Sequence, residues 1–250
     1  MKLMMENRAF WRARRPDARN RLICFPHAGA GASAFSEWAQ LLPDDIELAA
    51  VQLPGRQNRI AEDPAVDVAQ LVESLVSELS PILDGRFAFF GHSCGAVLAF
   101  ETACALRDRG LPTADHLFLS AQPEPGMRDS VRRLHDLSDA ELAAEMVRLG
   151  GLDPEVAANE AVMSILLPSV RADFTLWELH RPEPGAKLTC PITVLTGESD
   201  PRTPLHTVGG WREYTSGEFD IRLFPGGHFY FQSSGSDVVR LIGDTLLARN

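Results

Sequence analysis

Short apolar runs alternate with amphipathic stretches along most of the chain. Between the runs, apolar residues recur at steps of three and four, as at Val68, Leu71 and Leu75, which is the spacing of one helix face. This alternation is typical of a largely parallel sheet covered by helices on both faces, so it predicts an α/β fold. The runs expected to be buried strands are 21–25, 47–52, 86–90, 116–120, 192–196 and 220–224.

One long section interrupts the alternation. From about 127 to 184 the chain has helical spacing and no run typical of a strand. Ser138 and Glu141 predict a capping box, Gly150 should end that helix, Pro154 should begin the next, and Pro168 should split the remainder into two pieces.

A simple crossover between parallel strands needs only roughly a dozen residues, and this section is several times longer. We therefore interpret 127–184 as a helical lid inserted into a single domain, 1–250, whose core spans about 20–126 and 185–250. Ordinary helical packing is the alternative.

Composition narrows the class of protein. A chain of 250 residues with 45% hydrophobic content can bury a large core, and its net charge of −10 argues against broad nucleic-acid binding. The four cysteines form no metal-ligand spacing, and no apolar stretch is long enough for a signal peptide or a membrane span. We expect a reduced, cytoplasmic monomer without metal or cofactor.

The most specific chemical signal is the pentapeptide Gly91-His92-Ser93-Cys94-Gly95. It follows the apolar run 86–90 and precedes a stretch typical of a helix. Strand, tight turn and helix are the context of a nucleophile elbow, in which a strained turn exposes the serine hydroxyl above the sheet. Glycine is expected on both sides because a Cβ would crowd the neighbouring strand or helix. The pattern predicts Ser93 as a nucleophile.

A nucleophilic serine needs a histidine base, and the base needs an orienting acid that lies between them in the chain. Of seven histidines, only His206 and His228 lie beyond the acid candidates that follow the run 192–196. His228 is preferred because it follows the run 220–224 in a glycine-rich loop. His206 is expected to begin an exposed helix that contains Trp211.

Two residues could serve as the acid. Glu198 and Asp200 both lie in the turn after the run 192–196. Asp200 is preferred because the prolines that follow it should turn its loop back toward His228. The sequence thus predicts a triad of Ser93, Asp200 and His228, in which Asp200 holds the imidazole in its useful tautomer.

The tetrahedral intermediate of acyl transfer needs two N–H donors. One is expected from the backbone of Cys94, the residue after the nucleophile, and the other from the loop 26–31, with Ala28 as the expected donor. The Cys94 thiol should point away from the cavity and pack rather than attack.

The same loop allows a different interpretation. Residues 29–34 match the dinucleotide-binding pattern G-x-G-x-x-G/A after a strand. That pattern requires an acidic residue at the end of the next strand, and none is present at 50–53. A non-catalytic binding role is a second alternative, but it leaves the predicted triad and the intact elbow unexplained.

Several motifs together resemble those of type II thioesterases, the stand-alone editing hydrolases that accompany nonribosomal peptide and polyketide synthases. The similarity runs from about Arg21 to the C-terminus, and Cys94 is a departure, since the family more often has methionine there. The smaller side chain should trim pocket volume beside the nucleophile. The matching segments are 23–29, 51–56, 91–93, 167–168, 171–173 and 225–229.

The resemblance implies an α/β-hydrolase that releases acyl or aminoacyl groups from the phosphopantetheine thiol of carrier proteins. It places the catalytic roles on the same three residues and implies that the lid shapes the acyl pocket. Met146, Phe174 and Trp177 are candidate pocket residues, with packing on one another as the alternative. A general carboxylesterase or a cyclising acyltransferase with the same triad is the alternative function.

Overall fold

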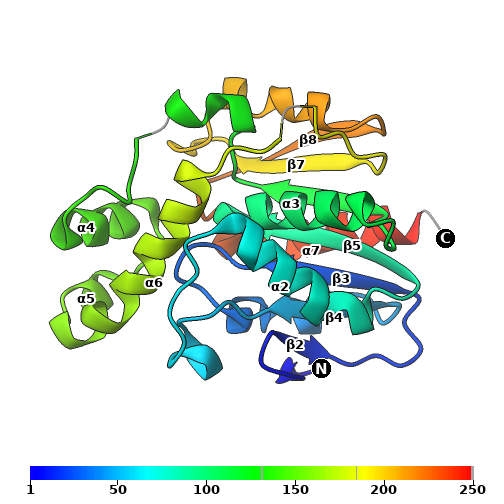
Figure 1. The fold of residues 1–250 in the computed structure, drawn as a ribbon, viewed down its shortest axis with the longest axis horizontal. Helices are drawn as coiled ribbons and strands as arrows, with labels where there is room; N and C mark the ends of the chain where they lie inside the picture. The colour runs from blue at the N-terminus through cyan, green and yellow to red at the C-terminus, as the bar shows by residue number, and fades with distance from the viewer. Residues whose placement is uncertain (131, 184, 249–250) are drawn as a thin grey trace.

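A twisted sheet forms the centre of the computed structural model, which describes residues 1–130, 132–183 and 185–248. Eight strands pair in the order β1-β2-β4-β3-β5-β6-β7-β8, as Figure 1 shows. Strands β3 to β8 are parallel, and β1 and β2 are antiparallel to their neighbours. The bounds are Met4–Met5, Phe10–Ala13, Asn20–Phe25, Ile46–Val51, Arg86–His92, His116–Ser120, Ile192–Gly197 and Phe219–Phe224 for β1 to β8.

The six strands predicted from apolar runs are confirmed as β3 to β8, with ends that shift by at most two residues. Strands β1 and β2 were not predicted. β2 buries only its first and last residues, Phe10 and Ala13, so its pattern carries little signal. β1 is two exposed residues long and is held by pairing with β2.

Helices cover both faces of the sheet. Helices α2 (Val68–Leu79) and α3 (Cys94–Asp108) lie on one face, and α1 (Trp38–Leu41) and α7 (Phe231–Leu247) lie on the other (Figure 1). Side chains alternate between these layers. In β5, for example, Phe87 and Phe89 pack into the α2–α3 core, while Ala88 and Phe90 pack into the α1–α7 core. The predicted α/β fold is confirmed.

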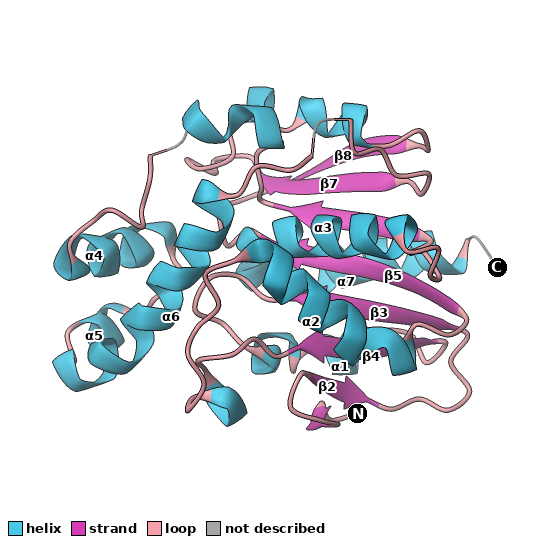
Figure 2. Ribbon diagram, in the orientation of Figure 1, coloured by secondary structure: helices cyan, strands magenta, loops and turns pink. Residues whose placement is uncertain are grey.

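Three further helices lie outside the sheet, next to the carboxyl ends of its parallel strands (Figure 2). They are α4 (Asp139–Leu149), α5 (Pro154–Ala157) and α6 (Glu160–Leu179). The predicted capping box of Ser138 and Glu141 is present, and Gly150 ends α4 with φ +86°. No strand occurs among the described residues of 127–184, as expected.

Pro168 does not split this region, so that prediction was wrong. Helix α6 runs for 20 residues with the proline inside it. An interior proline removes one helical hydrogen bond, but tertiary packing of the flanking turns can hold the helix together. Leu167 and Val170 on either side are buried in an apolar cluster with α4, which supplies that packing.

Short 3₁₀ helices complete the connections. The predicted surface helix after β7 is instead a pair of 3₁₀ segments, in which His206 is exposed and Trp211 is fully buried. The Trp211 indole donates a hydrogen bond to the carbonyl of Gln122 (2.9 Å). None of the described helices has the length and apolar content needed to cross a bilayer. The 3₁₀ segments are Ala32–Phe35, Gln57–Arg59, Ser80–Ile82, Pro125–Ser130, Leu205–Thr207 and Gly209–Tyr214.

Candidate active site

Ser93 occupies the sharp turn between β5 and α3. Its φ of +56° lies in the left-handed region, which a non-glycine residue adopts at a cost of about 1–3 kcal/mol. The Ser93 N–H donates to the carbonyl of Ser120 at the end of β6 (2.8 Å), which fixes the turn against the neighbouring strand. Strained backbone held by its surroundings is the geometry expected of a nucleophile elbow.

The glycines beside Ser93 are required by close packing, as predicted. A Cβ on Gly91 would overlap the backbone of Gly95 and Ala96 in the first turn of α3. A Cβ on Gly95 would overlap the carbonyls of Phe25 and Pro26, where β3 leads into the next loop. The two glycines therefore let strand, helix and loop converge around the serine.

Asp200 and His228 are paired in the structure. Asp200 Oδ2 lies 2.8 Å from His228 Nδ1, and both side chains are buried. The second carboxylate oxygen accepts the backbone N–H of Arg202 (2.8 Å). Burial disfavours the Asp200 anion, but the hydrogen bond and charge of His228 and the hydrogen bond from the Arg202 N–H outweigh it and lower the pKa of Asp200. An ionised carboxylate only accepts, so Nδ1 carries the proton and Nε2 is left as the acceptor.

Backbone packing brings together the loop that carries Asp200 and the loop that carries His228. A Cβ on Gly197, at the end of β7, would overlap the carbonyl of Gly227 in the histidine loop. The Ser199 N–H also donates to the Gly226 carbonyl (2.9 Å). The His228 ring then lies beside the elbow, with its centroid 5.2 Å from that of His92. Glu198, the other acid candidate, is exposed.

The two predicted oxyanion donors come from the elbow and from the loop after β3. Cys94 is the first residue of α3, and the N–H groups of a first helical turn have no acceptor within the helix. Ala28 lies in the loop after β3 and is buried in the same apolar cluster as Cys94. Burial, together with the charge of Asp173, raises the pKa of the Cys94 thiol well above its usual value, so it is not a thiolate.

A buried hydrogen-bond chain behind the elbow was not predicted. His92 Nδ1 lies 2.7 Å from Ser120 Oγ, which lies 2.7 Å from the Tyr230 hydroxyl. Burial, then the nearby His228 and His27, lowers the pKa of His92 well below its usual value, so its ring is neutral. The chain ties β5 and β6 to the segment after His228. Polar residues at two strand ends and beside the histidine were the only signal for it.

Arg202 is a second unpredicted feature. Its guanidinium is buried 5.5 Å from the ring centroid of Phe174 and 5.3 Å from that of Trp177, both on α6. It also lies 3.5 Å from the carboxylate of Glu178. Phe174 and Trp177 therefore pack against the Arg202 guanidinium, in the loop that carries Asp200, and not only on one another.

A small apolar cavity lies beside the loop after β3. Its volume is about 120 Å³, and its lining includes Met146 of α4, Leu167 and Val170 of α6, and His27 and Ala28 of the loop. Phe174 and Trp177 are not among its lining residues. Of the three pocket candidates, only Met146 therefore faces this space.

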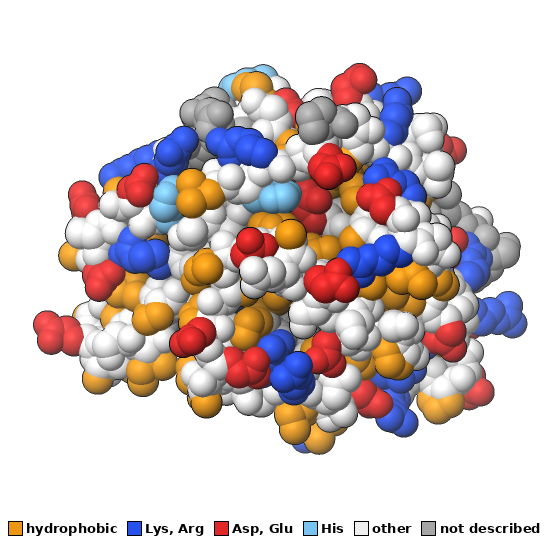
Figure 3. Space-filling model, in the orientation of Figure 1, with side chains coloured by type: hydrophobic (Ala, Val, Ile, Leu, Met, Phe, Trp, Pro, Cys, Tyr) orange, Lys and Arg blue, Asp and Glu red, His pale blue; other side chains and the backbone are white. Residues whose placement is uncertain are grey.

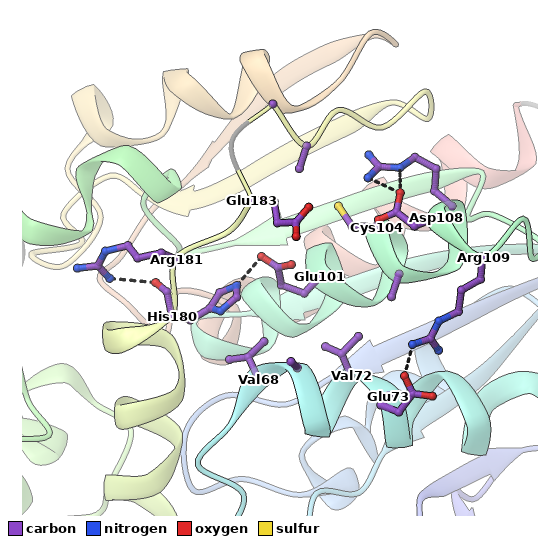
Figure 4. A pocket seen from close by; sticks show the side chains of 15 residues that line it. Val68, Val72, Glu73, Glu101, Cys104, Asp108, Arg109, His180, Arg181 and Glu183 are labelled. Carbon is purple, nitrogen blue, oxygen red and sulfur yellow. Dashed lines mark hydrogen bonds and ion pairs between the residues drawn. The ribbon is translucent and has the colours of Figure 1, made fainter.

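A larger cavity of about 440 Å³ lies elsewhere, between α2, α3 and the segment after α6. Figure 4 shows the side chains that line it, including His180, which is 2.7 Å from Glu101, and Arg109, which pairs with Glu73. Its walls mix both charge signs, and neither Ser93 nor His228 contributes to them.

In the loop that matched the dinucleotide pattern, two backbone N–H groups are already bonded to side chains of this protein. The Gly29 N–H donates to Asp173 (2.8 Å), and the Ala32 N–H donates to Gln52 (2.9 Å). Gln52 stands where a dinucleotide site would need an acid. Among the residues that the structure describes, no cluster of His, Cys, Asp and Glu is arranged to hold a metal ion.

Comparison with known proteins decides the family. A family model described as the thioesterase domain matches residues 20–246. The chain belongs to the thioesterase family. It is therefore a thioester hydrolase, and its sheet with flanking helices is the α/β-hydrolase fold of that family.

Relatives of this thioesterase include proteins of biosynthetic pathways. Thioesterase PikA5 of Streptomyces venezuelae is 40% identical over 93% of this chain and 83% of that protein. The gramicidin S biosynthesis protein GrsT of Aneurinibacillus migulanus is 38% identical over 90% of this chain and 88% of that protein. Among solved structures, the type II thioesterase BorB of the borrelidin cluster superimposes with a TM-score of 0.88 at 36% identity, covering 96% of this chain and 98% of BorB. The resemblance to type II thioesterases is confirmed.

Proposed function

We propose that this thioesterase releases acyl or aminoacyl groups from the phosphopantetheine arms of carrier proteins in a polyketide or nonribosomal peptide synthase. Ser93 is the nucleophile, His228 the general base, and Asp200 the acid that orients it. The N–H groups of Ala28 and Cys94 receive the oxyanion. The observation that carries the assignment is the buried Asp200–His228 hydrogen bond beside an elbow whose serine has φ +56°.

The reaction proceeds in two steps, acylation of Ser93 and hydrolysis of the acyl-serine. Ser93 Oγ attacks the thioester carbonyl carbon while His228 Nε2 takes its proton, and the carbonyl π electrons move to the oxygen. The tetrahedral intermediate collapses, the C–S bond breaks, and the departing thiolate takes the proton from His228. Water then attacks the acyl-serine ester and gives one proton to His228. Collapse breaks the C–Oγ bond, and His228 returns the proton to Ser93.

The lid, 127–184 on a core of about 20–126 and 185–250, governs which acyl group fits. The cavity of about 120 Å³ is apolar on its α4 and α6 side and adjoins Ala28, where the oxyanion would form. For comparison, a dry cavity of about 150 Å³ holds benzene. Met146 lines the cavity, so we assign it as a residue that limits acyl length.

A carrier protein would deliver the acyl group at the molecular surface. A phosphopantetheine arm is thin enough to enter beneath the lid while the carrier protein stays outside. Acidic and basic side chains are interspersed on the face in Figure 3, so docking there would use local complementarity rather than a general field. Four free cysteines fit a cytoplasmic enzyme, which we propose acts as a monomer.

The test compares hydrolysis of the same acyl group from a carrier protein, a small thiol and an alcohol. Propionyl-loaded acyl-carrier protein should be hydrolysed with kcat/KM at least about tenfold above propionyl-N-acetylcysteamine, because contacts remote from the carbonyl add binding energy. A propionyl oxygen ester of similar size should be slower still. Equal efficiency on carrier-bound and small thioesters would refute carrier editing, and faster cleavage of the oxygen ester would favour a general esterase. Transfer of the acyl group to an internal hydroxyl or amine would favour the cyclising acyltransferase.

A further inference from the structure

The predicted oxyanion donor Ala28 lies in a tight turn. The Ala30 N–H donates to the His27 carbonyl (3.0 Å), which closes a four-residue turn with Ala28 and Gly29 at its centre. Gly29 has φ +75°, the value that a type II turn needs at its third residue. Types I and II differ by a flip of the central peptide, here the one that joins Ala28 to Gly29.

The lid holds the central peptide of this turn. The Gly29 N–H donates to Asp173 Oδ2 on α6 (2.8 Å), a contact between residues 144 positions apart. Asp173 is also paired with Arg56 through both of its oxygens, with Arg56 Nη2 2.9 Å from Oδ1. Both charged side chains are buried, with exposed fractions of 1% for Asp173 and 4% for Arg56.

The same helix closes the turn sterically. A Cβ on Gly29 would overlap the side chain of Val170, one helical turn before Asp173. Asp173 therefore meets the turn at a point where α6 and the loop after β3 are already in close contact. A buried ion pair is poor as a source of stability, because desolvation offsets its attraction, so a positional role accounts for it better.

We propose that Asp173, charged and oriented by Arg56, is a positioning residue that locks the turn His27–Ala30 in the type II form. The inference rests on the proposed function, because it takes Ala28 as an oxyanion donor. A flip to type I turns the Gly29 N–H away and breaks its bond to Asp173. It also turns the Ala28 carbonyl toward the carboxylate, an approach of two acceptors that Asp173 opposes.

The lock has a consequence for catalysis. Oxyanion donors act only when they are held in place before the charge develops, and the loss of one costs about 10²–10³-fold in kcat. The Ala28 N–H belongs to the peptide before the one that flips, so Asp173 acts on it indirectly, by tying the whole turn to α6 through the Gly29 N–H. Without that contact the turn would move, and the Ala28 N–H would be held in place for only part of the time. Because Asp173 belongs to α6, the lid must be seated for the oxyanion hole to be set.

The test measures kcat and KM for propionyl-N-acetylcysteamine in two variants. Asp173→Asn keeps the shape but removes the charge. Arg56→Met with Asp173→Leu removes both charges and the acceptor for Gly29, and paired apolar replacements of buried ion pairs generally fold. The matched control is Glu47→Gln, a buried acid at the amino end of β4 that is paired with Arg12 and Arg21 and lies at the other end of the strands from Ser93. Propylboronic acid, whose boron accepts Ser93 Oγ to give a tetrahedral anion, reports oxyanion binding.

We expect kcat to fall about 10–100-fold in both variants, KM to change less than about threefold, and the boronate Ki to rise in parallel with the loss of kcat. Glu47→Gln should lose stability without these changes. Wild-type kcat and boronate affinity in the folded double variant would overturn the proposal, even if Asp173→Asn does not fold. Equal losses in Glu47→Gln would also overturn it. Ser93→Ala separates failure of the triad assignment from failure of the turn lock. If Ser93→Ala keeps activity, the proposed function fails. If Ser93→Ala is inactive while the double variant is normal, only the lock fails.

Discussion

The Asp200→Asn variant tests the orienting acid through the geometry of one carboxylate. Asp200 Oδ1 accepts the backbone N–H of Arg202, and Oδ2 faces His228 Nδ1, each at 2.8 Å. In asparagine one of these atoms becomes an NH₂ donor. Because the Arg202 N–H can only donate, the amide oxygen must stay with Arg202 and the NH₂ must face His228. His228 Nδ1 then becomes the acceptor, and the proton moves to Nε2, the atom that should take the proton of Ser93.

The wrong tautomer should cost about 10⁴-fold in kcat, as the same substitution does in a related triad, which corresponds to about 5.4 kcal/mol of barrier. Glu198→Gln is the matched control, since Glu198 is exposed and two residues away in the same turn. Release of free thiol from propionyl-N-acetylcysteamine measures both variants. The orienting role of Asp200 is refuted if Asp200→Asn keeps kcat within about tenfold of wild type, or if Glu198→Gln proves the more damaging change.

Three further predictions concern His27, Met146 and Arg202. Burial, then His228 and Arg56, lowers the pKa of His27 to about 3, so the unfolded chain takes up a proton below about pH 6.5 that the folded state refuses. The free energy of unfolding should therefore fall with decreasing pH. His27→Asn should reduce the slope of this free energy against pH by up to about 1.4 kcal/mol per pH unit, measured by urea titrations between pH 6.5 and 5. An unchanged slope would contradict this. Met146→Ala should raise the kcat/KM ratio of hexanoyl to propionyl thioester by about tenfold or more, and an unchanged ratio would remove Met146 from the acyl wall. Arg202→Met should lower the free energy of unfolding by about 3 kcal/mol because Glu178 loses a buried partner, whereas wild-type stability would show that the pair is dispensable.

The sequence predicted the core of the fold because local patterns encode it. Runs such as 116–120 are apolar on both faces, as a central parallel strand requires, and β6 has those bounds. The two antiparallel strands were missed because β1 and β2 bury few side chains and are fixed by pairing with their neighbours. Pro168 was misjudged because its neighbours in space, rather than its own backbone preference, decide whether α6 continues.

The predicted site residues were found from a local motif and from a rule of chain order. G-x-S-x-G between an apolar run and a helical stretch indicates an elbow, and the order of serine, acid and histidine restricts the partners to a few positions after β7 and β8. The contacts between Asp173 and Arg56, and between Arg202 and Glu178, follow no such rule. Arg56 and Asp173 are 117 positions apart, and only the packing of α6 against the loops places them together. Charged residues are usually solvated, so no sequence pattern pairs them.

The measurement that tests the account most directly is the rate at which Ser93→Ala hydrolyses propionyl-loaded acyl-carrier protein. The side chain is small and buried, so the variant should fold with wild-type stability. Without Ser93 Oγ no acyl-serine can form, and the rate should fall by about 10⁴-fold or more. A folded Ser93→Ala enzyme that hydrolyses the substrate at a rate near wild type would contradict the assignment of Ser93 as the nucleophile.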